Sequence, residues 1–350
     1  MKISIGANVV EGPWGGGNLF FKNFIEYFSN QGNTVVNDLL DDDIDLILLT
    51  DPRSDSVSSS FTHKEIKKYI KYINSNAIVV QRINECDERK STRGVNQFYM
   101  EANQIADHTV FVSSWVYNIY KKLGISKETS SVFLGGGDSN VFNSKNKQKW
   151  NEAEPIKLVT HHWSSNKHKG IEVYKKLDNL LEKSDIGKIL SFTYIGNIPK
   201  DIELLNTNLI EPMYGEQLSE ELKKHHIYIT ASMNEPSGNH HIEAAQSRLP
   251  ILYIGSGGIP EYCNGYGIEY NLDNLEEKIY ELINNYNFYY EKLLKYPFNN
   301  ESLLSSYKSL FEKLIEDKEN IISKRKMNYE NNLFKKNYFR LTLKINKLFN

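Results

Sequence analysis

The sequence predicts an α/β protein made of two doubly wound units, each a parallel sheet covered by helices. The chain has 350 residues, which is more than one hydrophobic core usually serves, so two domains are expected. Short apolar runs alternate with longer segments of helical pattern along the chain. That alternation is typical of parallel sheets whose strands are joined by crossover helices.

The elements fall into two series. In the first, strands are expected at 2–6, 34–37, 44–50, 77–82, 109–112 and 131–134, and helices at 18–29, 62–74, 94–107 and 115–123. In the second, strands are expected at 156–161, 189–195, 226–231 and 250–254, and helices near 169–184, 216–225, 240–248, 274–286 and 301–316.

The segment 135–155 divides the two series. It begins with three glycines, continues into the polar run 143–149, and has little to bury. We therefore predict a first domain at 1–140, a second domain at 155–300, a closing helix at 301–322 and a basic tail at 323–350. The closing helix could pack back on the first domain.

Composition favours a soluble enzyme of the cytoplasm. Hydrophobic content of 40% and charged content of 25% are those of a globular protein. No apolar stretch approaches the ~20 residues of a membrane span, and the first residues form a strand pattern rather than a signal peptide. Cys86 and Cys263 match no zinc or redox spacing. We expect no nucleic-acid partner.

The most informative segment surrounds Glu235 and Glu243, which are eight residues apart. An apolar run at 226–231 precedes Glu235, a loop of Ser237, Gly238 and Asn239 follows it, and a helix then carries Glu243. The N-terminus of a helix offers free N–H groups and a positive dipole end, which suit a phosphate. An ionised carboxylate on each side suits sugar hydroxyls. The segment therefore predicts a phosphorylated sugar as ligand.

Residues 226–262 resemble the donor site of the retaining nucleotide-sugar glycosyltransferases of family 4. The resemblance rests on the pair Glu235-x(7)-Glu243, on the segment 248–253 that continues the helix, and on Gly-Gly-Ile-Pro-Glu at 257–261. It implies the GT-B fold, in which two Rossmann-like, doubly wound parallel-sheet domains face an interdomain cleft that binds the ligands. The alternative is a pair of surface carboxylates that cap a helix.

The resemblance also implies roles for single residues. Glu235 would hold the sugar ring and Glu243 the ribose, while Lys169 would neutralise the leaving diphosphate, where fixed positive charge is most useful. The family places an arginine where this chain has Ser164, so one cation is missing. Arg82, Lys167 or a helix N-terminus could replace it.

Further donor contacts are implied elsewhere. Gly16 and Gly17 follow the first strand, where backbone can approach a diphosphate closely, although a tight connection explains the glycines as well. Their spacing is not that of a dinucleotide site. Gly196 ends a strand at the cleft, and Met213 lies where relatives contact the base through backbone groups. Backbone contacts do not reveal which nucleotide is bound.

The segment 81–90 is unusually polar for one that leaves an apolar strand. We place Arg82 and Asn84 on the acceptor side, since Arg can pair with a phosphate bidentately. A solvated loop with internal salt bridges is the alternative. For His161 and His162 a hydrogen-bond network is favoured over chemistry. No metal ligand set is found, and neither a metal nor another cofactor is expected.

The tail carries a charge of +7 between residues 323 and 350, so the other 322 residues carry −9. Apolar residues recur there at helical spacing, opposite a basic face. The apolar stripe is Phe334, Tyr338, Leu341, Ile345 and Leu348, and the basic face is Lys336, Arg340, Lys344 and Lys347. Such a helix suits an anionic membrane surface. Because Phe339 and Leu343 interrupt the basic face, a helix docked on the first domain and a disordered end stay open.

The sequence thus predicts a retaining, metal-independent hexosyltransferase that moves a sugar from a nucleotide-diphosphate sugar to a hydroxyl acceptor. A glycan or lipid-linked glycan in bacterial surface polysaccharide or glycoconjugate synthesis is the expected acceptor, with the enzyme cytoplasmic or peripheral on the inner face of the plasma membrane. Two alternatives stay open. One is a GT-B sugar-nucleotide epimerase. The other is a non-catalytic GT-B subunit that binds a glycan or a partner transferase, which Ser164 keeps in play.

Overall fold

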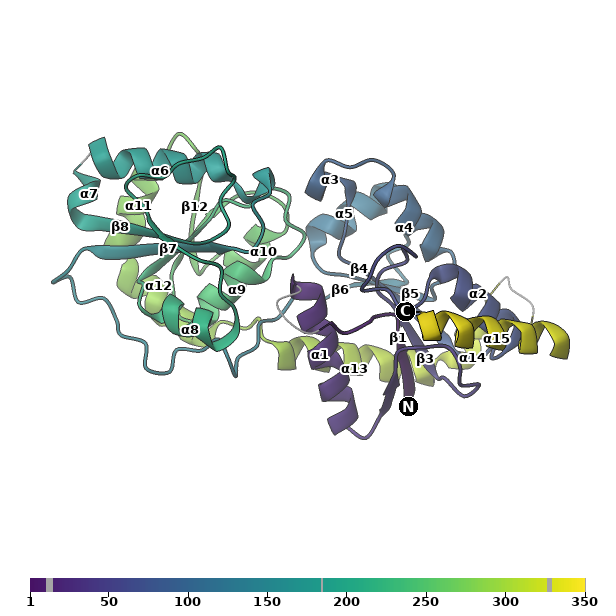
Figure 1. The fold of residues 1–350 in the computed structure, drawn as a ribbon. Coiled ribbons are helices and arrows are strands. Elements are labelled where there is room, and N and C mark those ends of the chain that lie inside the picture. Colours follow the sequence, from purple (N-terminus) through teal and green to yellow (C-terminus); the bar gives the residue numbers. More distant parts are fainter. Residues whose placement is uncertain (11–14, 184, 326–328, 350) are drawn as a thin grey trace.

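The computed structural model describes residues 1–10, 15–183, 185–325 and 329–349. The chain forms two α/β halves, each built on its own parallel sheet (Figure 1). This confirms the predicted fold class.

The N-terminal sheet has six strands in the order β2-β1-β3-β4-β5-β6, all parallel. Its strands are β1 (Lys2–Ile5), β2 (Thr34–Val36), β3 (Leu46–Leu49), β4 (Ile78–Ile83), β5 (His108–Phe111) and β6 (Ser130–Val132). Its helices are α1 (Gly15–Asn30), α2 (His63–Tyr72), α3 (Asp87–Lys90), α4 (Val95–Asn103) and α5 (Ser114–Lys122). Every residue of β3 and β4 is buried, as expected of central strands covered on both faces.

The C-terminal sheet also has six parallel strands, in the order β12-β11-β10-β7-β8-β9. They are β7 (Ile156–His162), β8 (Leu190–Gly196), β9 (Asn208–Ile210), β10 (Ile227–Thr230), β11 (Ile251–Ile254) and β12 (Gly267–Tyr270). The helices are α6 (Ile171–Lys183), α7 (Ile186–Ile189), α8 (Gly215–Lys223), α9 (Asn239–Gln246), α10 (Ile259–Cys263), α11 (Leu275–Asn284) and α12 (Tyr286–Lys292), with short 3₁₀ turns η1 (Lys167–Lys169) and η2 (Leu293–Lys295).

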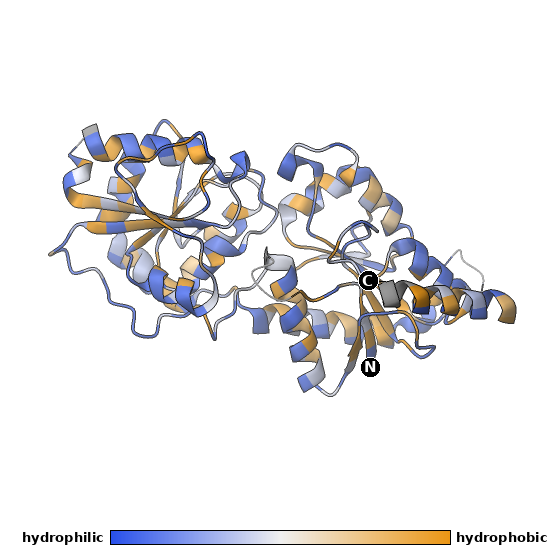
Figure 2. Ribbon diagram, viewed as in Figure 1, coloured by the Kyte–Doolittle hydropathy of each residue, from blue (hydrophilic) through white to orange (hydrophobic). Residues whose placement is uncertain are grey.

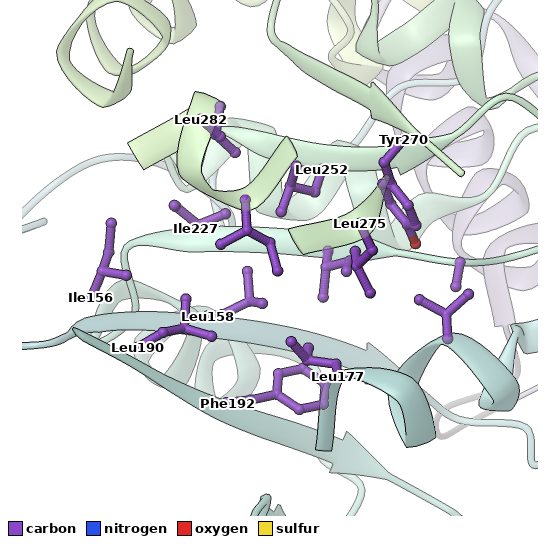
Figure 3. Close-up of a cluster of buried hydrophobic side chains, with 14 of the residues drawn as sticks. Ile156, Leu158, Leu177, Leu190, Phe192, Ile227, Leu252, Tyr270, Leu275 and Leu282 are labelled. Carbon is purple, nitrogen blue, oxygen red and sulfur yellow. The ribbon is translucent and has the colours of Figure 1, made fainter. Parts of the chain in front are cut away.

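Hydrophobic residues concentrate on the strands of both sheets and on parts of the helices that cover them (Figure 2). In the C-terminal half, Leu158, Phe192 and Ile227 project from the sheet into a cluster that Leu177 of α6 and Leu275 of α11 close (Figure 3). These cores fix the strand ends, and so fix the loops that leave them.

The segment between the halves differs from the expectation that it has little to bury. Phe142 is buried in the C-terminal core. The backbone oxygen of Val141 accepts a 2.6 Å hydrogen bond from Ser219 of α8, and Lys147 donates to the backbone oxygen of Lys223 at 2.9 Å. Val141, Phe142 and Lys147 therefore hold this segment against the C-terminal half, and Val141 and Lys147 do so through α8.

The chain returns to the N-terminal half after α12. Helix α13 (Asn300–Glu316) buries Tyr307 and Phe311 against Phe24 and Phe28 of α1. It is followed by α14 (Lys318–Ser323) and α15 (Leu333–Phe349). Both lie on the N-terminal half (Figure 1).

Helix α15 docks on the N-terminal half through the residues that interrupt its predicted basic face. Phe339 and Leu343 are buried in the cluster that contains Ile66 of α2. Lys336 and Arg340 face Asp42, at 3.9 and 2.9 Å. Helix α15 is therefore docked, with Phe334, Tyr338, Leu341 and Ile345 of the predicted apolar stripe on its outer side. The side chains of Lys347 and Leu348 lie outside the described part of the structure.

Candidate active site

The site is built where β10 ends and α9 begins. Gly238 precedes α9 with a φ of +83°, and a Cβ on it would lie 2.9 Å from the Cγ of Glu235. Only glycine adopts this conformation in so little space without strain. The loop therefore turns tightly and sets Glu235 beside the first turn of α9, where N–H groups are free for an anion.

Glu235 is 6% exposed and lies between two cations. Lys169 Nζ is 2.6 Å from Oε2, and Arg89 Nε is 3.7 Å from Oε1. Burial alone would raise the pKa of Glu235, but the charges of Lys169 and Arg89 outweigh it and hold the pKa below its ordinary value. Glu235 is therefore an ionised carboxylate at neutral pH, fixed in orientation by both halves.

Arg89, on α3 of the N-terminal half, was not singled out from the sequence. Its Nη1 also lies 3.2 Å from Glu85, which Lys90 approaches to 3.6 Å. A row of alternating charges thus crosses from one half to the other: Lys90, Glu85, Arg89, Glu235 and Lys169. The polar run 81–90 indicated charged residues, but the link to Glu235 joins positions 146 apart and exists only in the fold.

The first turns of α1 and α9 meet across the same place. A Cβ on Gly16 would lie 2.9 Å from the side-chain oxygen of Asn239, whereas one on Gly17 would meet nothing within 4 Å. Of the two glycines, Gly16 is the one in close contact with the other half. It brings two helix N-termini together, one from each half, and both favour negative charge nearby.

Glu243 lies one turn along α9 and accepts a 2.9 Å hydrogen bond from His161 Nε2. Behind it, His162 and His240 bond Tyr174 and Thr230 through their ring nitrogens, at 2.7 and 2.8 Å. Burial lowers the pKa of both rings well below the ordinary value, so they are neutral. This uncharged, hydrogen-bonded layer supports the wall of the site.

His241 follows on the other side of α9. Burial lowers the pKa of His241 to about 3, so its ring is also neutral. Neither ring nitrogen has a hydrogen-bond partner among the described residues.

The other predicted donor contacts lie around this centre at varying distance. Ser237 donates to Tyr262 Oη at 2.9 Å. Gly196 pairs with His162 at the end of β8, and a Cβ there would strike the backbone oxygen of His162. Met213 packs in the C-terminal core near α8. Ser164 is exposed in the loop after β7 and accepts a hydrogen bond from the Asn166 backbone at 3.2 Å.

Arg82 is buried at the carboxyl end of β4, with Cζ 4.3 Å from the centre of the Phe20 ring. Its Nη1 has no hydrogen-bond partner within the part of the chain that the structure describes. Asn84 follows it, half-buried, immediately before the charge row begins at Glu85. A buried guanidinium with an open donor suits an anion.

The two halves are in contact around this site. The Glu261 carboxylate accepts from the N–H groups of Ser114 and Trp115, at 2.8 and 2.9 Å, and so caps α5 of the other half. Asn234 donates to the Glu88 backbone at 3.1 Å. The Gly-Gly-Ile-Pro-Glu motif thus ends in an interdomain cap, and α3 covers Glu235. Among the described residues, no group of three or more His, Cys, Asp or Glu is arranged to hold a metal ion.

The sheets, the crossover connections and the interdomain site define the GT-B fold, which comparison with solved structures supports. The lipopolysaccharide outer core galactosyltransferase WaaB is 12% identical, with a TM-score of 0.65 over 90% of this chain and all of that one. HepE of Anabaena, solved with UDP and glucose, is 11% identical, with a TM-score of 0.63 over 89% of this chain and 99% of that one.

The sucrose-phosphate synthase of Thermosynechococcus elongatus is 12% identical, with a TM-score of 0.61 over 90% of this chain and 99% of that one. The chain therefore has the fold of GT-B glycosyltransferases, as the sequence predicted. Neither comparison with protein-family models nor comparison with curated proteins gave a match.

Proposed function

We propose that the protein is a retaining, metal-independent glycosyltransferase that uses a nucleotide-diphosphate sugar. One observation carries the proposal: on a GT-B scaffold, Glu235 is buried and ionised beside the N-terminus of α9, with Lys169 at 2.6 Å and Arg89 at 3.7 Å. A carboxylate of this kind binds sugar hydroxyls, and the cations beside it bind phosphate. The charge and shape of the site fit both parts of such a donor.

In the proposed complex the diphosphate lies between the first turns of α1 and α9, beside Lys169. The bond between the anomeric carbon and the diphosphate oxygen breaks, and a bond from that carbon to the acceptor oxygen forms on the same face. The acceptor proton passes to the departing phosphate oxygen, so no protein base is needed. Negative charge grows on the diphosphate as it leaves, and the preorganised positive groups stabilise it.

Glu235 positions the sugar by accepting hydrogen bonds from its hydroxyls, and Glu243 would accept from the ribose. His161 donates a hydrogen bond to one carboxylate oxygen of Glu243, so ribose binding would use the second oxygen or share the first. Glu235 is 6% exposed, and donor access therefore requires α3 to move away from the C-terminal half.

For the acceptor we propose a glycan or lipid-linked glycan of bacterial surface polysaccharide or glycoconjugate synthesis, reached at the inner face of the plasma membrane. Arg82 supports an acceptor with an anionic group, because its buried guanidinium has an unpaired nitrogen. A phosphate that links a glycan to its carrier has the matching charge.

The test is turnover of a panel of UDP-, GDP- and ADP-sugars, with release of nucleoside diphosphate as the signal and nuclear magnetic resonance to define the anomer of the product. We expect one donor class to turn over, with retained configuration and equal rates in excess EDTA and in magnesium. Inverted product or loss of activity in EDTA would contradict the mechanism. Epimerised donor without transfer would support a sugar-nucleotide epimerase instead.

A further inference from the structure

The outer side of α15 is an apolar stripe that the fold leaves uncovered. Phe334, Tyr338, Leu341 and Ile345 are 81, 67, 55 and 45% exposed. At about 100° per residue they fall within roughly 60° of one another on the helix. Phe339 and Leu343 dock on the opposite side. Exposed apolar residues are ordinary when scattered, but a continuous row of large ones marks an interaction surface.

Exposed lysines lie on α15 and on the helix beside it. Lys344 is exposed on α15 itself. The neighbouring helix α2 carries Lys64, Lys67 and Lys68, all exposed, on the face turned away from its buried residues. The two helices lie side by side at the edge of the N-terminal half (Figure 1). Lys68 Nζ is 5.9 Å from the centre of the Phe339 ring, so this lysine of α2 contacts α15.

Two acids near this surface, Glu330 and Asp42, are paired with bases, whereas Glu65 of α2 accepts hydrogen bonds from Thr62. Glu330 lies 2.5 Å from Lys71 and 2.9 Å from Lys335. Asp42 faces Arg340 and Lys336 on the docked side. The surface therefore combines an exposed apolar row with an excess of positive charge. This combination favours an anionic bilayer over a second copy of the chain as the partner. A second copy of the chain would bring the same charges into repulsion, whereas an anionic bilayer accepts both the apolar side chains and the bases.

We infer that α15 and α2 together form a docking surface for an anionic lipid membrane. The four apolar side chains of α15 insert at the level of the headgroups, and the lysines of α2 and α15 contact the anionic headgroups. Helix α15 stays docked through Phe339 and Leu343 while it binds, so the N-terminal half is held against the bilayer as a rigid body. This inference rests on the proposed function only for its choice of a lipid-linked acceptor.

The experiment is flotation of the full chain with phosphatidylcholine vesicles that contain roughly one third phosphatidylglycerol, at about 0.1 M salt, where charges act over about 10 Å. Neither donor nor acceptor is present, so the result is independent of the transferase assignment. We expect binding that fails on pure phosphatidylcholine and weakens as salt rises. Deletion of the tail is unsuitable, because it would expose the core around Ile66.

The decisive variants change only exposed side chains. Phe334→Ser with Leu341→Ser should weaken binding at least about tenfold, because apolar insertion is lost. The matched control is Leu205→Ser with Leu294→Ser, at 83 and 60% exposure in the other half, which should bind like the parent. Lys64→Gln with Lys67→Gln should weaken binding about fivefold for each lysine that is removed. The control Lys121→Gln with Lys122→Gln removes two exposed lysines of α5 and should weaken binding much less.

Equal vesicle binding by the stripe variant and the parent would overturn the proposal. The proposal would also fail if the parent chain did not bind the vesicles and instead formed a dimer, and if Phe334→Ser with Leu341→Ser dissociated that dimer. The stripe would then be an interface between copies of the chain. Turnover of a soluble acceptor by the stripe variant should equal that of the parent. A chain that binds vesicles but turns over no donor would leave the membrane surface intact and defeat the proposed function.

Discussion

A carboxylate with 6% of its surface exposed stays ionised only where cations offset its lost hydration, and Glu235 has two. Each comes from a different half of the molecule. In the proposed function, the oxygen atoms that would bind the sugar are thus adjacent to the nitrogen atoms that would bind the phosphate. Positioning of this kind is a large part of the rate of a transfer reaction.

Glu235→Gln should lower kcat by about a hundredfold or more, because the neutral amide holds the sugar and the cations less well. The fold should be unchanged by circular dichroism, since the side chain keeps its shape. Glu269→Gln, at an exposed position of the same half, is the control and should keep full activity. Wild-type turnover by the Glu235 variant would show that the donor site lies elsewhere.

The ionisation of Glu235 also predicts a pH dependence of stability. The pKa of Glu235 in the folded chain lies below the ordinary value of 4.5, so its ionised form stabilises the fold fully above that pH. The stabilisation is lost as pH falls from 4.5 through the folded pKa. Thermal unfolding of the parent and of Glu235→Gln should therefore differ most at neutral pH and converge in acid. A difference that grows in acid would contradict the assignment.

Lys169 and Arg89 should act on turnover more than on affinity, because the charge they stabilise is largest as the diphosphate leaves. We expect Lys169→Ala to lower kcat roughly a hundredfold. Arg89→Gln should lower it less, and Arg89→Lys should restore part of the loss. Arg93→Gln, at an exposed position nearby, is the matched control. A raised KM with unchanged kcat would make Lys169 and Arg89 binding residues only.

Helix α15 carries two apolar faces, one docked on the protein and one exposed. Phe339 is 4% exposed and Phe334 is 81% exposed, five residues apart. The sequence favoured the longer stripe as the functional face and treated Phe339 and Leu343 as interruptions. Helical periodicity identifies apolar rows, but it does not say which row packs on the protein.

Phe339→Ala should therefore lower the free energy of unfolding by about 3 kcal/mol, as buried phenylalanines do. Phe334→Ala should change it by no more than about 0.5 kcal/mol. Chemical denaturation of the two variants gives the comparison on the same helix. Equal losses, or the larger loss at Phe334, would mean that α15 docks by its other face.

Strands predicted from long apolar runs, such as those that became β7 and β8, were found with boundaries within a residue or two. The short edge strands β9 and β12 were missed, since Asn208 and Gly267 at their starts weaken a strand pattern. The helix expected near 274–286 corresponds to α11, and α12, which begins one residue after Asn285, was not predicted. Local pattern is thus sufficient for central elements and weak at the edges.

The sequence indicated the fold and those residues of the candidate site that lie in the C-terminal half. Glu235, Glu243 and Lys169 lie in one half and belong to recognisable local patterns. Arg89 and the meeting of Gly16 with Asn239 depend on how the halves face each other. No local pattern contains that information, since the partners are separated by more than a hundred residues.

Calorimetric titration of the full chain with UDP, GDP and ADP shows directly whether the two halves together hold a nucleoside diphosphate. We expect at least one of the three to bind once per chain. The free diphosphate carries the full charge that Lys169 and Arg89 stabilise, so its binding depends on them more than binding of the sugar donor does. The double variant Lys169→Ala with Arg89→Gln, which removes one cation from each half, should therefore weaken nucleoside diphosphate binding by about a hundredfold. The control Lys121→Gln with Arg93→Gln should bind like the parent. Binding of none of the three nucleotides, or equal affinity of the parent and the double variant, would contradict a donor site formed by both halves.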